Sequence, residues 1–149
     1  MKVALVGASG FIGSRILAEL VRRGHSVTAI TRNPDKVPAQ AQVASVKGDV
    51  YDRDGLAKAI AGHDAVITSV HYTASDPALL LEAVRASGVK RYLVVGGAGS
   101  LDVAPGARLV DQPSFPAAYK AEALKGGDFL TQLRGEKDVD WTFLSPAFV

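Results

Sequence analysis

Three glycines at a fixed spacing follow the first apolar run of the chain and open its first helical pattern. The run occupies residues 3–6, and Gly7, Gly10 and Gly13 come directly after it as G-x-x-G-x-x-G. The first glycine permits a sharp turn out of a strand, the second a close approach of a ligand to the backbone, and the third close packing of helix on sheet. The segment therefore predicts a strand–turn–helix unit of a parallel sheet.

The same alternation continues along the chain. Amphipathic helical patterns separate short apolar runs, which are rich in β-branched and aromatic residues and lie at residues 26–31, 43–46, 65–70, 92–95 and 141–144. Continuous runs of this kind are typical of parallel strands covered on both faces. We expect a single α/β domain over residues 1–149: a doubly wound parallel sheet of about six strands in a three-layer Rossmann arrangement.

Capping residues set the expected helix ends. One helix should begin at Asp52 and end at Gly62, and another should begin at Asp76 and end at Gly88. A final helix is expected within residues 117–134, with a break at the glycine pair 126–127. The stretch 96–116 has no clear periodicity, and long loops of this kind are often functional.

Composition excludes several classes of function. The formal net charge is +2 and no basic block occurs, which disfavours nucleic acid and anionic membranes as partners. The absence of cysteine excludes disulfides and thiolate chemistry, and the three histidines lack the spacing of metal ligands. Since the apolar start is too short for a signal peptide or a membrane span, we expect a cytoplasmic protein.

The glycine segment predicts a dinucleotide site. A helix that starts after Gly10 presents free N–H groups and a partial positive charge to a pyrophosphate. The predicted contacts in this segment are Gly7, Ser9, Gly10, Phe11, Ile12 and Gly13. An ordinary tight turn is the alternative, whereas a P-loop is excluded because no Gly-Lys-Ser/Thr follows.

The end of the second apolar run bears on the choice of dinucleotide. An NAD site usually carries an acid there, but this chain has Arg32 and Asn33. A guanidinium suits a 2′-phosphate, so NADP(H) is favoured over NAD(H); the alternative is that Arg32 is simply solvated.

Two further segments should border the cofactor. Asp49 and Val50 follow the third run, near the expected adenine pocket, although Asp49 could instead bind turn amides. Ser69, Val70 and His71 end the fourth run, which should lie beside the first at the switch point of the sheet.

The sequence resembles the atypical short-chain dehydrogenase/reductase superfamily. The similarity is greatest to its NAD(P)H-binding branch, which is flavin-reductase-like (biliverdin-IXβ-reductase-like) and epimerase-dehydratase-like. The residues that carry this resemblance are 7–13 (GASGFIG), 24–25 (GH), 31–33 (TRN), 48–50 (GDV), 94–101 (VVGGAGSL), 115–120 (FPAAYK) and 140–146 (DWTFLSP).

The resemblance implies candidate catalytic residues and two departures. It points to Ser100, Tyr119 and Lys120, with the alternatives that Ser100 is a turn residue and that Tyr119 and Lys120 lie on a solvated helix face. The Tyr-x-x-x-Lys pair of the main type of short-chain dehydrogenase is missing, because Ala123 stands four residues after Tyr119. Adjacent helix residues point about 100° apart, so Tyr119 and Lys120 cannot reproduce that pair. Members of this branch also continue past the final Ser-Pro segment, so a substrate-side C-terminal region is expected to be absent.

These observations lead to one main hypothesis and two alternatives. The main hypothesis is an NADPH-dependent oxidoreductase that transfers hydride to a flavin or a similar planar small molecule. In such a reaction the cofactor supplies the chemistry and the protein positions the two rings. A non-catalytic NADP(H)-binding redox sensor stays open. A sugar-nucleotide epimerase or dehydratase is disfavoured by the missing Tyr-x-x-x-Lys pair. Homo-oligomerisation also stays open.

Overall fold

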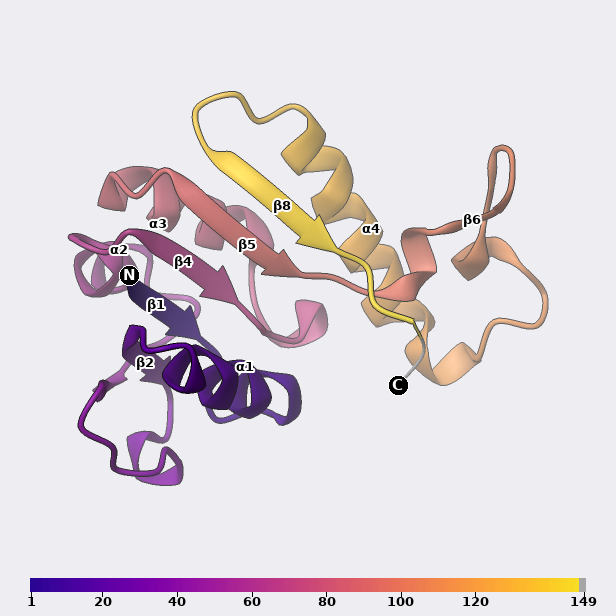
Figure 1. Ribbon diagram of the computed structural model, residues 1–149. Helices are drawn as coiled ribbons and strands as arrows, with labels where there is room; N and C mark the ends of the chain where they lie inside the picture. Colours follow the sequence, from indigo (N-terminus) through magenta and orange to yellow (C-terminus); the bar gives the residue numbers. More distant parts are fainter. Residues whose placement is uncertain (148–149) are drawn as a thin grey trace.

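The computed structural model describes residues 1–147 and contains a six-stranded parallel sheet (Figure 1). The strand order is β3-β2-β1-β4-β5-β8, which is the doubly wound order and confirms the predicted fold class. The strands are β1 (Lys2–Val6), β2 (Ser26–Thr31), β3 (Val43–Lys47), β4 (Ala65–Thr68), β5 (Arg91–Val95) and β8 (Asp140–Leu144). Because β1 lies between β2 and β4, their carboxyl ends meet at the switch point of the sheet.

Four helices cover the sheet, three of them at the larger core and one on the opposite face. They are α1 (Phe11–Arg22), α2 (Arg53–Ile60), α3 (Pro77–Ser87) and α4 (Lys120–Arg134). Helices α2, α3 and α4 supply Leu56, Leu80 and Phe129 to the larger core, whereas α1 packs on the opposite face with Leu17 buried against β1 and β2. No helix within residues 1–147 is long and apolar enough to cross a membrane.

The predicted caps are confirmed. The Asp52 side chain accepts a hydrogen bond from the Gly55 N–H at 3.0 Å, and the Asp76 side chain accepts one from the Leu79 N–H at 3.2 Å. Gly88 closes α3 with a φ of 79°, a left-handed conformation that glycine adopts without strain. The ends of these helices are therefore fixed by capping residues within a few positions of each end.

Two expectations about irregular regions were wrong. Helix α4 runs unbroken through Gly126 and Gly127. A Cβ at Gly126 would lie 3.3 Å from the Tyr72 ring, so this glycine allows close packing and does not break the helix. The stretch 96–116 is also not wholly irregular, since it forms a projecting hairpin of β6 (Asp102–Ala104) and β7 (Ala107–Arg108) (Figure 1).

Short 3-10 turns connect these elements. They are η1 (Pro34–Lys36), η2 (Tyr72–Ala74), η3 (Ala98–Ser100), η4 (Leu109–Asp111) and η5 (Ala117–Tyr119). Strand β4 ends at Thr68, two residues before the expected end, so that Ser69 and Val70 leave the sheet and lead toward η2.

Candidate functional site

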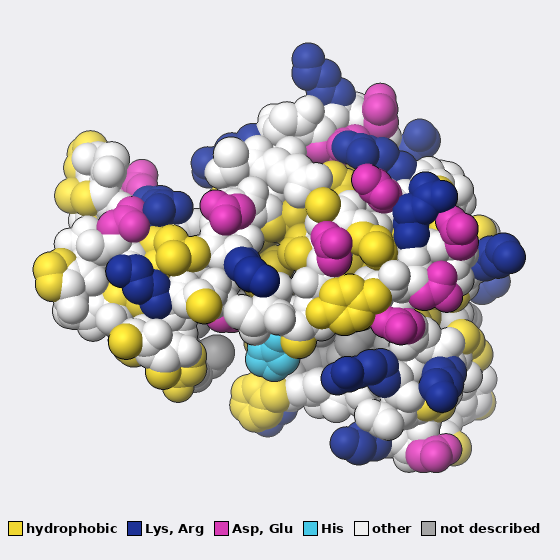
Figure 2. Space-filling view, turned by 180° about the vertical axis from the view of Figure 1, so that it is seen from behind, with side chains coloured by type: hydrophobic (Ala, Val, Ile, Leu, Met, Phe, Trp, Pro, Cys, Tyr) yellow, Lys and Arg dark blue, Asp and Glu magenta, His cyan; other side chains and the backbone are white. Residues whose placement is uncertain are grey.

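Two adjoining cavities lie at the carboxyl ends of the strands. The smaller, of about 170 Å³, is bordered by the turn after β1, the end of β2 and the loop after β3. The larger, of about 350 Å³, extends toward β5, η3 and α4. Gly10, Ser69, Val70 and His71 line both. Figure 2 shows the molecule hollowed between the main body and the smaller lobe that carries the hairpin. The two cavities therefore adjoin along these four residues.

Two glycines of the loop are required by steric contact. Gly7 has a φ of 87°, and a Cβ there would lie 2.0 Å from the Ser69 carbonyl oxygen. A Cβ at Gly13 would lie 1.9 Å from the Gly7 carbonyl oxygen. Both contacts are far shorter than van der Waals distance, so the strand–turn–helix packing depends on glycine here. Gly10 is less constrained, with the Gly7 oxygen 3.4 Å from an added Cβ, and it lies at the cleft.

The N-terminus of α1 is open to an anion. Gly10 is its N-cap and supplies no side-chain hydrogen bond, and no acid lies in the first turn. Within residues 1–147, the N–H groups of Phe11, Ile12 and Gly13 have no hydrogen-bond partner. This donor set, together with the steric requirements of the loop, fits the pyrophosphate of a dinucleotide. Phe11 and Ile12 line the larger cavity, whereas Gly13 is buried behind them.

The end of β2 is fixed against the glycine loop. The Ser9 and Thr31 hydroxyl oxygens are 2.7 Å apart, and Thr31 Oγ1 also accepts from the Asn33 N–H at 3.2 Å. Arg32 and Asn33 line the smaller cavity. The Arg32 guanidinium is exposed and has no hydrogen bond or ion pair with any described residue, which leaves its donors available to a ligand.

Asp49 does not line either cavity. Its carboxylate accepts a hydrogen bond from the Tyr51 N–H at 2.8 Å, which is the turn-stabilising alternative. Its neighbours Gly48 and Val50 line the smaller cavity instead.

The larger cavity brings together residues distant in sequence. Ser100 and Tyr119 line it, whereas Lys120, the first residue of α4, does not. Most other lining groups are aromatic or small; they are Phe11, Ile12, Tyr72, Val95, Gly96, Gly97, Ala98, Gly99, Phe115, Ala123, Gly126, Gly127, Pro146 and Ala147. The cavity is therefore suited to flat apolar groups.

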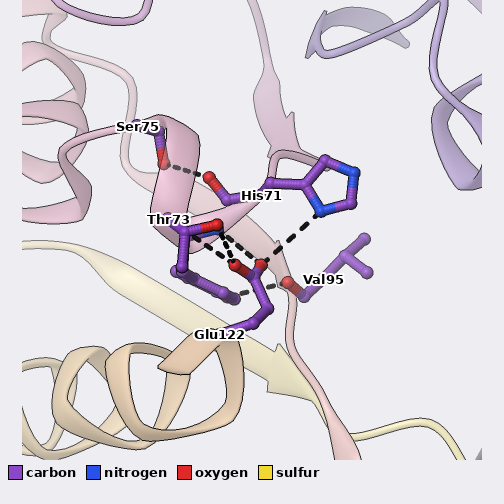
Figure 3. Close-up of polar contacts among 6 residues, drawn as sticks. His71, Thr73, Ser75, Val95 and Glu122 are labelled. Carbon is purple, nitrogen blue, oxygen red and sulfur yellow. Dashed lines mark hydrogen bonds and ion pairs between the residues drawn. The ribbon is translucent and has the colours of Figure 1, made fainter. Parts of the chain in front are cut away.

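Glu122 is a site residue that the sequence did not reveal. Its carboxylate accepts hydrogen bonds from the Tyr72 N–H at 2.6 Å, the Thr73 N–H at 2.8 Å and the Thr73 hydroxyl at 2.8 Å (Figure 3). The Nδ1 atom of His71 lies 3.7 Å from Glu122 Oε1. This carboxylate joins α4 to η2, the turn that follows the shared wall of the two cavities. An acid in the first turn of a helix was the only sequence signal, and it usually indicates capping.

Tyr72 is fixed as a neutral phenol. Its hydroxyl donates to the Val95 carbonyl oxygen at 2.8 Å, and its ring packs against Phe129 with the centroids 6.1 Å apart. Burial raises the pKa of Tyr72 well above its usual value. The side chain therefore joins η2 to the end of β5.

Comparison with known proteins agrees with this geometry. Residues 7–149 match a family model described as NAD(P)H-binding. The chain is 44% identical to the uncharacterized protein YwnB of Bacillus subtilis, over 99% of this chain and 72% of that protein.

Similar solved structures agree as well. A proposed epimerase from Bacteroides thetaiotaomicron is 40% identical, with a TM-score of 0.91, over 98% of this chain and 70% of that one. A proposed NADH-flavin reductase from Streptococcus pneumoniae is 36% identical, with a TM-score of 0.76, over 98% and 71%. A protein from Burkholderia pseudomallei, described as a proposed exported protein, is 46% identical, with a TM-score of 0.84, over 98% and 72%. The chain belongs to the NAD(P)H-binding family of Rossmann proteins.

Proposed function

We propose that this protein is an NADPH-dependent oxidoreductase that transfers hydride to a flavin or a similar planar acceptor. The observation that carries the proposal is the pair of adjoining cavities at the switch point, with the N-cap of α1, Gly10, in the lining of both. The smaller cavity lies where the adenosine half of a dinucleotide would extend, beside the end of β2. The larger one has room for a nicotinamide ring and the edge of a second ring.

The preference for NADPH rests on Arg32. A free guanidinium at the end of β2 provides a planar set of donors for a 2′-phosphate, and no carboxylate of residues 1–147 lines the smaller cavity. Lys36, in the following turn η1, is also exposed and adds positive charge nearby.

The acceptor side requires little from the protein. Hydride transfer between nicotinamide and a flavin needs the two rings to be stacked in the correct geometry, and the cofactors supply the chemistry. An aromatic cavity without a Tyr-x-x-x-Lys pair is consistent with that requirement. The similarity to a proposed NADH-flavin reductase supports the same class of acceptor.

The test is turnover with purified protein. We expect NADPH absorbance to fall when riboflavin, FMN or FAD is added, at a rate proportional to enzyme concentration. Tight NADPH binding without turnover by any acceptor would contradict the proposal. That result would favour a redox sensor, a role that the exposure of Tyr119 and the position of Lys120 outside the cavity also fit.

Replacing Arg32 tests the choice of cofactor. Arg32→Asp should weaken NADPH about 30-fold or more, because a charge-assisted hydrogen bond is lost and a repulsive charge is introduced. NADH affinity should change little. Arg134→Asp, the same charge change at the exposed end of α4, is the matched control and should leave both affinities unchanged. An equal loss for NADPH and NADH in Arg32→Asp would refute the 2′-phosphate contact.

A further inference from the structure

The two ends of the cleft have opposite electrostatic character. The cofactor end offers open backbone N–H groups and the Arg32 guanidinium, both of which attract anions. The acceptor end carries the Glu122 carboxylate, and among the described residues no lysine or arginine lines the larger cavity. An anionic group that enters beyond the N-terminus of α1 therefore meets the Glu122 carboxylate with no lysine or arginine of the lining to compensate it.

The charge of Glu122 is built into the fold. Two backbone N–H groups and one hydroxyl donate to its oxygens, and a carboxylate is the form that only accepts. The neighbouring cation is already paired, because the Arg108 guanidinium, behind Gly127, binds the Asp111 carboxylate through contacts of 2.9 and 3.2 Å. Its positive charge is therefore largely neutralised before it can act on the cavity.

The remaining walls favour flat, uncharged groups. Phe115, Tyr119 and Pro146 present apolar surfaces, and Gly126 and Gly127 line the cavity without a side chain. Ring stacking and contact with apolar walls thus dominate recognition at this end.

We infer that Glu122 is a specificity-determining residue that restricts the acceptor to uncharged planar rings, such as a quinone or an isoalloxazine whose anionic tail stays outside the cavity. The inference rests on the proposed function. For a quinone, NADPH supplies a hydride and solvent supplies a proton, so that NADPH, quinone and H⁺ give NADP⁺ and hydroquinone. Each side balances in atoms and electrons.

A matched pair of quinones tests this inference. The probes are a methyl-naphthoquinone and the naphthoquinone that carries a sulfonate in place of the methyl group. The sulfonate makes the ring a stronger oxidant, so a preference for the uncharged quinone has to come from binding and orientation. We expect kcat/KM to be about tenfold or more higher for the uncharged quinone at low salt. Equal values, or a preference for the sulfonate, would overturn the inference.

Three variants test whether the preference for the uncharged quinone depends on the charge of Glu122. Glu122→Gln should bring the ratio of the two kcat/KM values toward one. Thr73→Val removes a donor to the same carboxylate but keeps its charge, so the ratio should stay at the wild-type value. Ala147→Lys adds a cation to the cavity lining and should also lower the ratio. A wild-type ratio in Glu122→Gln would contradict the assignment to Glu122, whatever the ratio in Ala147→Lys.

A measurement of quinone binding tests this inference independently of the proposed function. Calorimetry with the NADP⁺-bound protein should give the same preference in affinity for the uncharged quinone. If neither quinone is turned over, the proposed function fails, while the affinity ratio still decides whether Glu122 selects against anions.

Discussion

Gly13 carries the most stringent steric requirement in the site. Its Cα faces the Gly7 carbonyl oxygen, and an added methyl group would overlap that atom. Gly13→Ala should therefore lower the free energy of unfolding by about 2–4 kcal/mol and abolish measurable NADPH binding, since the helix must move off the sheet. Urea denaturation and calorimetric titration measure the two effects.

Gly24 provides the control at the same scale. It follows α1 with a φ of 81° and open space around its Cα. Gly24→Ala should cost about 1 kcal/mol of stability from backbone strain alone and leave the Kd for NADPH unchanged. Wild-type NADPH affinity in Gly13→Ala would show that the loop tolerates a side chain at this position. It would contradict the close contact between Gly13 and the Gly7 carbonyl oxygen.

Single residues were predicted from sequence where their function is local. The glycine spacing could be recognised because its steric role depends on the chain immediately around it, whereas the cofactor contact of Arg32 stays a prediction. Asp49 was ambiguous for the same reason: an aspartate after a strand serves equally well in a turn, and here it binds the Tyr51 N–H. Glu122 could not be found, because its partners Tyr72 and Thr73 lie about fifty residues away in the chain.

At the scale of elements, one hydroxyl joins η2 to β5. Tyr72→Phe removes the hydrogen bond to the Val95 carbonyl and should lower the free energy of unfolding by about 1–2 kcal/mol, since both groups lie in a partly buried region. Tyr51→Phe, at an exposed tyrosine, is the control and should be neutral. Thermal and urea unfolding compare the two variants. Equal stabilities would mean that water replaces the lost bond at Val95.

Helix boundaries were predicted well and the region after β5 was not. The caps at Asp52, Asp76 and Gly88 act through hydrogen bonds within a few residues, so the sequence alone predicts these helix ends. The glycine pair in α4 has the same sequence signal as a helix break, but its cause is the nearby Tyr72 ring. The β6–β7 hairpin has strands of three and two residues, too short to produce a recognisable alternation.

At the scale of the whole molecule, an ion pair joins α3 to the segment after α4. The Arg85 guanidinium binds the Glu136 carboxylate, whose side chain is only 1% exposed. Arg85→Met should cost about 1–3 kcal/mol at neutral pH, because a shielded carboxylate loses its charged donor. Arg22→Met breaks an exposed pair with Glu19 and should have little effect. Urea denaturation measures both.

The same pair predicts a pH dependence. The hydrogen bond with Arg85 holds the pKa of the Glu136 carboxyl below its usual value. A lowered folded-state pKa stabilises the protein above the unfolded-state value of about 4.3, and this contribution is lost as the pH falls through the folded-state value. The stability difference between wild type and Arg85→Met should therefore shrink in that acid range. A difference that stays constant there would contradict the role of Glu136.

The global arrangement was largely predictable. Right-handed crossovers and short connections leave few ways to order six parallel strands, so the position of β4 beside β1 and the cleft at their ends followed from the alternation of elements. The contribution of α4 to the larger cavity could not be predicted, because it depends on packing between elements that no sequence periodicity encodes.

The proposed function requires a dinucleotide to bind with its phosphates at the N-terminus of α1. The most direct measurement is a titration of the ¹⁵N-labelled protein with NADPH, followed through its amide resonances. We expect large, saturable shifts at Phe11, Ile12 and Gly13, with a shift at Arg32 that NADH does not reproduce. Saturable shifts elsewhere, with the amides of Phe11, Ile12 and Gly13 unmoved, would contradict binding at this helix terminus.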